Sequence, residues 1–248
     1  MPPPRWPSRS DLTARIEVIP ETGSTNADLL ARLAAGERVP EGQWLVADRQ
    51  TTGRGRQGRN WIDAPGNFMG STVVHVADRD PSPATLSFVA ALAVYETVLP
   101  HVAMPQALML KWPNDVMLSG AKFCGLLLEM GQGAVVVGIG VNLVAAPQID
   151  GRETASLANL TRDAFAAALA AQFAMELQRW REFRPEPIVR RWLAAAHPTG
   201  TPLTVHGGAD ETISGKFDGL EPTGALRLRL PDGSTRVVHA GDVTLEDS

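Results

Sequence analysis

The sequence predicts an α+β protein, with a large mixed-sheet domain followed by a small C-terminal β-barrel. In the middle of the chain strand-like runs dominate and helical segments flank them, which favours a mixed sheet covered by helices. Beyond residue 200 the pattern changes to short alternating strands joined by glycine turns, as in a small barrel. We therefore expect two domains, residues 1–198 and 199–248.

The composition is that of a globular chain with a real core. The 248 residues are 44% hydrophobic and 20% charged, which excludes a disordered chain and a collagen-like repeat. The single cysteine, Cys124, excludes an internal disulfide and gives no sign of an oxidising compartment. The net charge of −4 argues against a surface adapted as a whole to nucleic acid or anionic lipid. Any phosphate chemistry must therefore lie in a local basic patch.

Targeting signals are not evident in the sequence. The amino terminus has no apolar run of signal-peptide length. The most apolar later stretch, residues 164–177, is interrupted by Gln172 and Glu176, so it does not predict a membrane span. We expect a cytoplasmic protein with no membrane partner.

Local periodicity and turn residues define the elements of the first half of the large domain. A helix begins with Ser24 or Thr25 as N-cap and ends at Gly36, since both ends carry the residues that helices prefer there. Alternating apolar runs predict strands, and a longer periodic run predicts a second helix. The strands are expected at residues 16–20, 43–48 and 69–76, and the helix at residues 83–99.

The second half of the chain adds three further strands, a helical region and the barrel. Turns at residues 113–115, 119–120 and 131–133 separate or bound the strands. The strands are expected at residues 107–111, 122–130 and 134–143. Residues 155–197 have a helical pattern, with segments at 162–183 and 186–196. The barrel strands are expected at residues 202–207, 211–220, 224–233 and 234–245.

A glycine-rich loop at residues 50–60 carries three arginines, Arg54, Arg56 and Arg59. Glycine lets a backbone approach a ligand, and arginine forks match phosphate or carboxylate oxygens. We therefore expect an anion-binding loop, with a solvated hairpin tip or an RNA-binding arginine–glycine loop as alternatives. The acidic balance and the lack of interleaved aromatic residues oppose RNA binding. The loop is not a P-loop, because the lysine–serine/threonine ending is missing.

Lysines are rare, and two of them flank a polar turn. Of the 23 basic residues three are lysines, at positions 111, 122 and 216. Two lie eleven residues apart, which indicates a site that needs ammonium groups, although chance is the alternative. After Lys111, Asn114 could bond a nucleotide and Asp115 could hold Mg²⁺. An ordinary β-turn explains the same residues.

Other candidate residues carry weaker signals. The five histidines show no ligand spacing, so we expect no structural metal. Cys124 lies in a predicted strand, where a core role is favoured over that of a nucleophile. Ser24, as a helix cap, can also present its hydroxyl and the helix amides to a ligand. Gly125 either lets a flat ligand approach its strand or marks a bulge after a surface lysine.

Taken in order, five motifs resemble those of the biotin-protein ligases. They are STN at 24–26, ADRQTTGRGRQGRNW at 47–61, KWPND at 111–115, KFCGLLLE at 122–129 and GIGVN at 138–142. The resemblance extends from about residue 17 to 248. It implies a mixed-sheet catalytic domain related to class II aminoacyl-tRNA synthetases and an SH3-like barrel. It points to the form without an N-terminal DNA-binding domain, so no DNA partner is expected.

The resemblance also implies site residues. On the biotin side, Ser24, Thr25 and Gln50 would hydrogen-bond biotin, Gly53 would line the ring and Asn26 would close the wall. The residues with implied catalytic roles are Lys122, Arg54, Arg56, Lys111 and Asp115, the last a candidate Mg²⁺ ligand. Further implied binding residues are Gly55, Arg59, Trp61, Asn114, Gly125 and Asn142.

The resemblance implies roles for several of these residues on the nucleotide side. Lys122 would bond the biotin carboxylate and then the α-phosphate. Arg54 and Arg56 would grip the carboxylate and phosphates, and Arg59 would meet the leaving pyrophosphate. Trp61 would stack on adenine.

The resemblance implies a two-step reaction with ATP and Mg²⁺. Biotin and ATP would form biotinyl-5′-AMP and pyrophosphate, and the biotinyl group would pass to one lysine of a biotin carboxyl-carrier domain. A homodimer is also within the expectations for such a chain. The alternative is a lipoate or octanoyl-protein ligase of the same fold, although those families lack the GRGRxGR loop.

Overall fold

The computed structural model describes residues 15–183, 185–207 and 212–246. The amino-terminal segment, on which the expectation of no signal peptide and no extra DNA-binding domain depends, lies outside these residues. Strands of the large unit are β1 (Ile16–Thr22), β2 (Trp44–Gln50), β3 (Phe68–His75), β4 (Leu108–Lys111), β5 (Asp115–Leu118), β6 (Ala121–Gly131) and β7 (Ala134–Val141). Its helices are α1 (Thr25–Ala34), α2 (Leu86–Val98), α3 (Arg162–Glu182) and α4 (Pro185–Ala195). The C-terminal strands are β8 (Pro202–His206), β9 (Thr212–Leu220), β10 (Leu226–Arg229), β11 (Thr235–Val238) and β12 (Asp242–Leu245).

The large sheet is mixed, as predicted. Its order among the described residues is β1-β2-β3-β7-β6-β5-β4. β1 and β2 run parallel and are joined through α1, whereas the other neighbours are antiparallel. A parallel pair needs a crossover connection, and α1 supplies it. This brings the start of α1 beside the end of β2.

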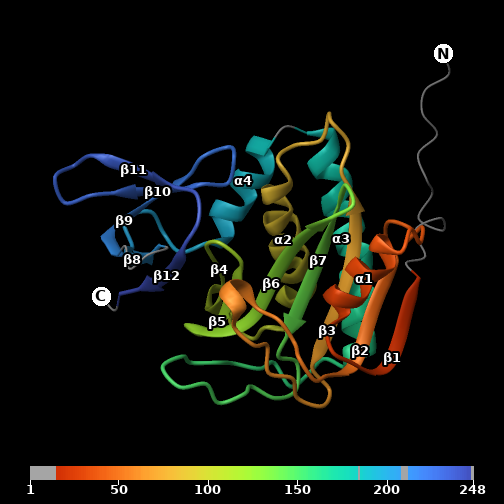
Figure 1. Ribbon diagram of the computed structural model, residues 1–248. Coiled ribbons are helices and arrows are strands. Elements are labelled where there is room, and N and C mark those ends of the chain that lie inside the picture. Colours follow the sequence, from red (N-terminus) through yellow and green to blue (C-terminus); the bar gives the residue numbers. More distant parts are fainter. Residues whose placement is uncertain (1–14, 184, 208–211, 247–248) are drawn as a thin grey trace.

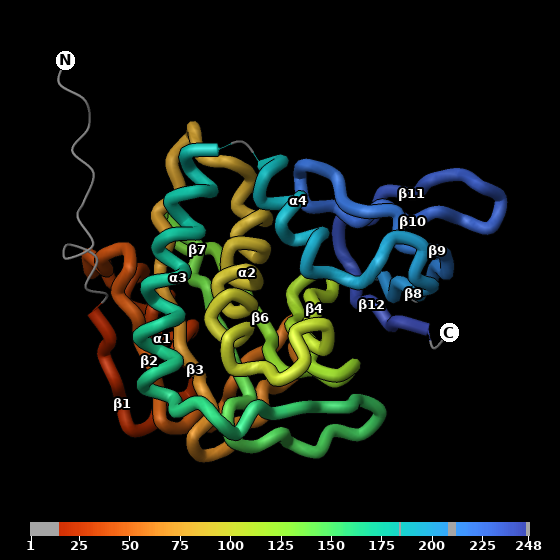
Figure 2. The backbone as a smooth tube through the Cα atoms, turned by 180° about the vertical axis from the view of Figure 1, so that it is seen from behind, coloured from red at the N-terminus to blue at the C-terminus, as the bar shows by residue number. Residues whose placement is uncertain are grey.

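Helices cover both faces of the sheet (Figures 1 and 2). Because side chains alternate along a strand, neighbouring residues of β2 enter different cores. Leu45 packs in a small cluster with Leu29 and Leu33 of α1, whereas Trp44 and Val46 belong to the main core with α2 and α3. Figure 2 shows α3 in front of the sheet on the side opposite α1.

The helical stretch Pro83–His101 is long and apolar enough to cross a membrane by length and composition, with a mean hydropathy of 1.3. It lies instead within the protein, between the sheet and α3, and ten of its α2 residues are buried. The expectation that residues 164–177 are the most apolar stretch is therefore wrong. The apolar character of α2 follows from burial on every side.

Three predicted elements need correction. Only Asp115 of β5 was expected in a turn and residues 116–118 were given no element, but Asp115–Leu118 pairs with both β4 and β6. Residues 155–161 are not helical, because Ala155 and Ala158 donate their amides to Lys122 and Leu143 instead. The predicted strand at 234–245 is two strands, β11 and β12. The non-helical course of residues 155–161 and the pairing of β12 with β8 reflect hydrogen bonds to distant parts of the chain.

The C-terminal unit is a five-stranded antiparallel sheet with the order β11-β10-β9-β8-β12 among the described residues. β11 and β12 lie at its two ends, so the described strands do not close into a ring. Leu203, Phe217 and Leu226 belong to the same buried cluster as the core of the large unit. The two units therefore share one apolar interior.

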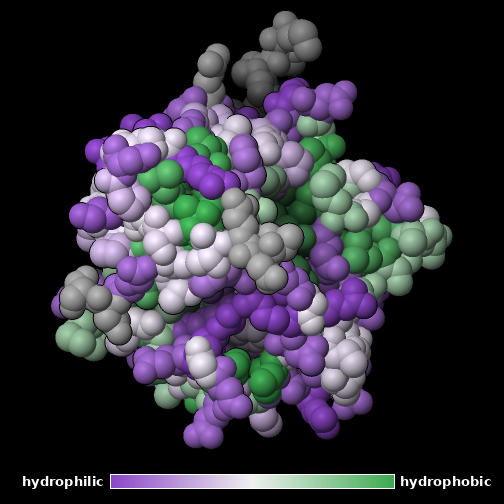
Figure 3. Space-filling view, turned by 60° about the vertical axis from the view of Figure 1, so that its left-hand side comes forward, coloured by the Kyte–Doolittle hydropathy of each residue, from purple (hydrophilic) through white to green (hydrophobic). Residues whose placement is uncertain are grey.

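On the face shown in Figure 3 hydrophilic residues are widespread, and apolar residues are visible in separate groups. The exposed large apolar side chains come from different elements, for example Met104, Met130 and Phe183. Isolated apolar residues of this kind are ordinary on a protein surface.

The joint between the units contains a buried histidine that makes stability depend on pH. His197 is 3% exposed, its ring centroid lies 4.3 Å from that of Phe217, and burial lowers its pKa from 6.5 to about 4. In the unfolded chain this histidine is therefore protonated below about pH 6.5, whereas in the folded protein it stays neutral down to about pH 4. We expect this histidine to cost about 2 kcal/mol of unfolding free energy on going from pH 7 to pH 5.

Denaturant unfolding at both pH values tests this expectation. The His197→Phe protein should lose about 2 kcal/mol less than wild type over the same interval. His206→Gln, which changes an exposed histidine, serves as the control and should behave like wild type. Equal losses in wild type and His197→Phe would contradict the assignment.

Candidate active site

One cavity is lined by almost all of the residues singled out in the sequence. It lies where the start of α1, the loop after β2, the middle of the sheet and β12 meet. Of the residues predicted for the site, all except Gly53 line this cavity. Gly53 supports the loop instead, since a Cβ there would lie 2.7 Å from the carbonyl oxygen of Trp61.

A network of hydrogen bonds forms one wall of the cavity at the start of α1. The amide and hydroxyl of Thr25 donate to Gln50 Oε1 at 2.8 and 3.0 Å. The Thr25 hydroxyl also lies 2.7 Å from that of Ser71, which donates to Asn26 Oδ1 at 2.6 Å. Ser24 is the N-cap residue, as predicted, but its side chain makes no capping hydrogen bond. These groups give the wall fixed donors and acceptors.

Glycines of β6 and β7 make the floor of the cavity flat. A Cβ at Gly140 would lie 2.5 Å from Trp61 Cε2, and one at Gly125 would lie 3.1 Å from Trp61 Cζ3. A Cβ at Gly138 would lie 2.3 Å from Asn26 Oδ1. The strands therefore tolerate a planar group directly on their backbones, and in this structure the indole of Trp61 lies there.

The glycine-rich loop at residues 50–60, called the arginine loop below, is a tight hairpin. Trp61 N donates to Gly53 O at 2.9 Å and Gly55 N donates to Arg59 O at 2.7 Å, so the loop closes on itself. Arg56 donates to Asn114 Oδ1 at 3.2 Å and to Gly241 O at 3.4 Å. Burial lowers the pKa of the Arg56 guanidinium, and Asp242 opposes that shift.

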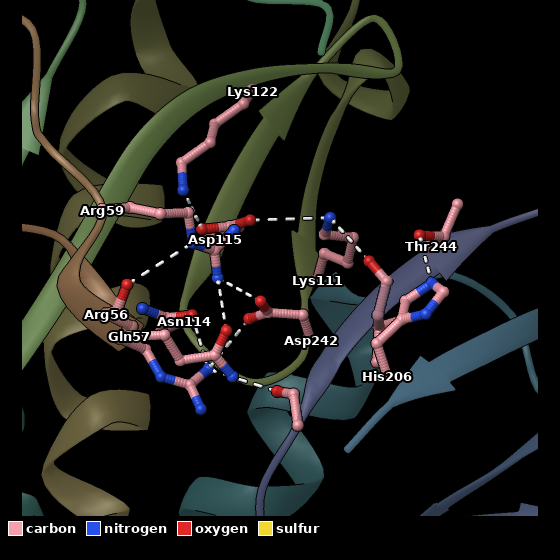
Figure 4. A network of polar contacts seen from close by, with 12 residues as sticks. Arg56, Gln57, Arg59, Lys111, Asn114, Asp115, Lys122, His206, Asp242 and Thr244 are labelled. Atoms are coloured by element: carbon pink, nitrogen blue, oxygen red, sulfur yellow. Dashed lines mark hydrogen bonds and ion pairs between the residues drawn. The ribbon is translucent and has the colours of Figure 1, made fainter. Parts of the chain in front are cut away.

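Asp242 of the C-terminal sheet lies between two of the loop arginines (Figure 4). Arg59 hydrogen-bonds its carboxylate, and Arg56 lies 3.7 Å from it. The loop therefore contacts a carboxylate that is more than 180 residues away in sequence. Arginines that hold a carboxylate in this way also match the oxygens of a phosphate.

Two lysines share one buried carboxylate at the centre of the site (Figure 4). Lys122 Nζ lies 2.5 Å from Asp115 Oδ1, and Lys111 Nζ lies 3.5 Å from Asp115 Oδ2. Burial opposes ionisation of Asp115, but Lys122 and Lys111 hold the pKa of that carboxyl below its usual range. Burial also lowers the pKa of Lys111, against the opposing effect of Asp115. Two ammonium groups against one carboxylate leave the cluster one positive charge in excess.

Asparagines fix the strands around this cluster. Asn114 Nδ2 donates to Leu126 O, which holds the turn after Lys111 against β6. Asn142 is 2% exposed and its Nδ2 lies 3.5 Å from Lys122 O. Asn67, which the sequence did not single out, donates to Asn142 Oδ1 at 3.4 Å.

Sequence reasoning missed several residues of the cavity. Ser71, Arg152, Asp242 and Val243 line it, and Lys111 donates to Val243 O at 3.0 Å. Ser71 lies in the strand predicted at residues 69–76, and no motif residue was assigned there. Nothing local marks Asp242, because its role depends on the contact between the two units.

A nucleophilic role for Cys124 finds no support in the structure. Cys124 is fully buried, and burial raises the pKa of its thiol strongly. Within the described part of the chain there is no group of three or more His, Cys, Asp or Glu side chains that could hold a metal ion.

Comparisons with known proteins agree with this geometry. Residues 18–143 match the model of the biotin/lipoate A/B protein ligase family, and residues 204–245 match that of the biotin protein ligase C-terminal domain. A biotin–[acetyl-CoA-carboxylase] ligase of Paracoccus denitrificans is 37% identical, over 91% of this chain and 98% of the relative. A ligase of the same name from Mycobacterium tuberculosis is 36% identical, over 92% and 88%. The structure of a biotin protein ligase from Aquifex aeolicus with biotin and ATP superposes with a TM-score of 0.80 at 25% identity, over 94% of this chain and 99% of that one.

Proposed function

The chain belongs to the biotin/lipoate A/B protein ligase family, and from that premise we propose how its own residues carry out the reaction. It is an ATP-dependent ligase that activates biotin as biotinyl-5′-AMP and transfers the biotinyl group to a protein lysine. The observation that carries the proposal is the Lys111–Asp115–Lys122 cluster that lines a cavity with a flat glycine floor.

In the first step a biotin carboxylate oxygen attacks the α-phosphorus of ATP, and pyrophosphate leaves. The reaction brings two anions together, so cations on the developing charge are the main requirement. Lys122 and Lys111 provide them, and Asp115 holds both ammonium groups in place. Arg56 and Arg59 would exchange Asp242 for phosphate oxygens.

In the second step the amine of an acceptor lysine attacks the carbonyl carbon of the mixed anhydride. An amide bond forms, the bond from the carbonyl carbon to the phosphate oxygen breaks, AMP leaves, and the amine proton passes to solvent. The adenylate hydrolyses readily in water, so the arginine loop must cover it between the steps. The contacts of Arg56 with Asn114 and Gly241 are suited to holding the loop in that position.

The other residues of the cavity divide between the two substrates. Ser24, Thr25, Asn26 and Gln50 would bind the ureido part of biotin with their donors and acceptors. In the ternary complex Trp61 would turn its indole toward adenine, and Asn142 would bond its edge. Both Trp61 and Asn142 line the cavity in the present structure.

Mg²⁺ would enter with the triphosphate rather than bind to a preformed site. Both carboxylate oxygens of Asp115, the candidate ligand, face lysine ammonium groups. Magnesium takes six oxygen ligands in a regular octahedron, and a carboxylate already neutralised by two cations is a poor donor. Asp115 therefore does not fit a direct magnesium ligand, and we derive no step through the metal.

Exchange of labelled pyrophosphate into ATP tests the function directly. We expect exchange that depends on biotin and is weak with lipoate, because the wall at α1 offers several polar partners to a ureido ring and lipoate has none to match them. A discrimination of about 100-fold in kcat/KM is expected, because only the ureido group of biotin can hydrogen-bond the polar groups of the wall. Equal exchange with both acids would favour the alternative function of a lipoate-protein ligase.

The acceptor, the location and the domain division remain parts of the proposal. A carrier domain of a biotin-dependent carboxylase is the proposed acceptor, which the name of the relatives supports. We propose a cytoplasmic location and a functional boundary between residues 198 and 199. A homodimer is proposed as well, and sedimentation equilibrium with and without biotin tests it.

A further inference from the structure

Glu129, near the end of β6, connects two parts of the site that the reaction uses at different moments. Its side chain is 26% exposed. Oε2 accepts a hydrogen bond from Asn26 Nδ2 at 2.8 Å, and Oε1 lies 3.7 Å from the guanidinium of Arg54. One carboxylate thus contacts both the wall at α1 and the arginine loop.

From Asn26 the contacts continue through the wall. Asn26 Oδ1 accepts from Ser71 at 2.6 Å, and Ser71 lies 2.7 Å from the Thr25 hydroxyl, which donates to Gln50. The amide of Asn26 has little freedom, because it lies directly over Gly138, where a Cβ would approach Oδ1 to 2.3 Å. Since Nδ2 faces Glu129, Oδ1 must face Ser71. Glu129 therefore fixes which way the Asn26 amide faces and makes the Ser71 hydroxyl the donor to Asn26 Oδ1.

On the loop side, the partner of Glu129 is the exposed side chain of Arg54. Arg54 is 54% exposed, and its only ion-pair partner among the described residues is Glu129. Arg54 lies between Gly53 and Gly55 in the chain, so the backbone around it changes conformation easily. Its ion pair is the contact that holds this side of the loop toward the wall.

We propose that Glu129 is a positioning residue that couples closure of the arginine loop to the biotin-binding wall, an inference that rests on the proposed function. When the wall is ordered around biotin, the carboxylate is fixed by Asn26 and offers Arg54 a set position. When the loop closes and Arg54 pairs with it, the carboxylate in turn holds Asn26. Each event lowers the ordering cost of the other, so loop closure slows the escape of biotin.

The Glu129→Gln variant separates the two contacts. Glutamine still accepts a hydrogen bond from Asn26, but it lacks the charge that attracts Arg54. We expect labelled biotin, chased with unlabelled biotin, to dissociate about fivefold faster from Glu129→Gln than from wild type, as fits a half-exposed ion pair. The difference should shrink in about 0.5 M salt, which screens such pairs.

A double-mutant cycle with Arg54→Gln makes the coupling measurable. Each single variant should dissociate biotin about fivefold faster, and the double variant no faster than either single one. Glu21→Gln is the matched control, since Glu21 forms an exposed ion pair with Arg49 at 3.5 Å and neither residue lines the cavity. It should leave the dissociation rate unchanged.

The outcomes are distinct. Independent, multiplicative effects of the two substitutions, or unchanged dissociation with altered thermal stability alone, would overturn the coupling. If Glu129→Gln does not fold, Arg54→Gln, which changes the exposed partner, still tests the coupling. An unchanged rate of biotin dissociation from Arg54→Gln would also overturn the proposal. Failure of wild type to bind biotin at all would instead contradict the proposed function.

Discussion

Replacing Lys122 by alanine is expected to slow the formation of biotinyl-5′-AMP by about 10²- to 10³-fold, the usual cost of losing one preorganised donor to developing charge. Lys122 is held by Asp115 at 2.5 Å, so its ammonium group is in place before the substrates react. The effect should appear mainly in the rate of the chemical step, with a smaller loss of biotin affinity. Single-turnover formation of the adenylate measures it.

The buried carboxylate requires a careful control for Lys122→Ala. Without Lys122, the remaining ion pair of Asp115 among the described residues is that with Lys111 at 3.5 Å, so part of any loss could come from altered packing. Lys122→Arg keeps the charge and should fold normally while remaining slow, because the guanidinium fork differs in shape from an ammonium group. Lys216→Ala removes the exposed third lysine and should be fully active. Adenylation by Lys122→Ala within about threefold of wild type would contradict a catalytic role.

Changing Arg56 to glycine is expected to release the adenylate about 10- to 100-fold faster, given the usual strength of hydrogen bonds from charged groups. The guanidinium of Arg56 joins the loop to Asn114 and to the C-terminal sheet at Gly241 and Asp242. Glycine removes these anchors and adds backbone freedom. The adenylate should then escape and modify lysines of unrelated proteins.

Dissociation of supplied biotinyl-5′-AMP measures this effect without any contribution from its synthesis. Gln57→Gly is the matched control, because it adds a glycine to the same loop at an exposed position with a φ of 55° and removes none of the Arg56 anchors. It should release the adenylate at nearly the wild-type rate. If Arg56→Gly retains the adenylate as well as the control, Arg56 does not hold the loop closed.

Local sequence was sufficient for elements whose residues repeat with a clear period between clear turn residues. The cap at Ser24 and the strands around residues 44–50 and 134–141 were found in this way, because side-chain alternation and helix caps are short-range properties. The strand β5 was missed because its four residues are too few to show a clear alternation. Its pairing with β4 and β6 became visible only in the structure. Residues 155–161 have helical composition, but backbone bonds to Lys122 and Leu143 prevent a helix there.

The sequence by itself determined which residues stand in motif positions. All of the predicted site residues except Gly53 line one cavity. What it did not determine is how they are held. The carboxylate of Asp242, the hydroxyl of Ser71 and the link from Glu129 to Asn26 and Arg54 depend on segments far apart in the chain. Hydrogen bonds and ion pairs act over a few ångströms of space. The residues that separate two partners along the chain do not indicate that the partners will meet. Only the folded arrangement of the two units brings those partners together.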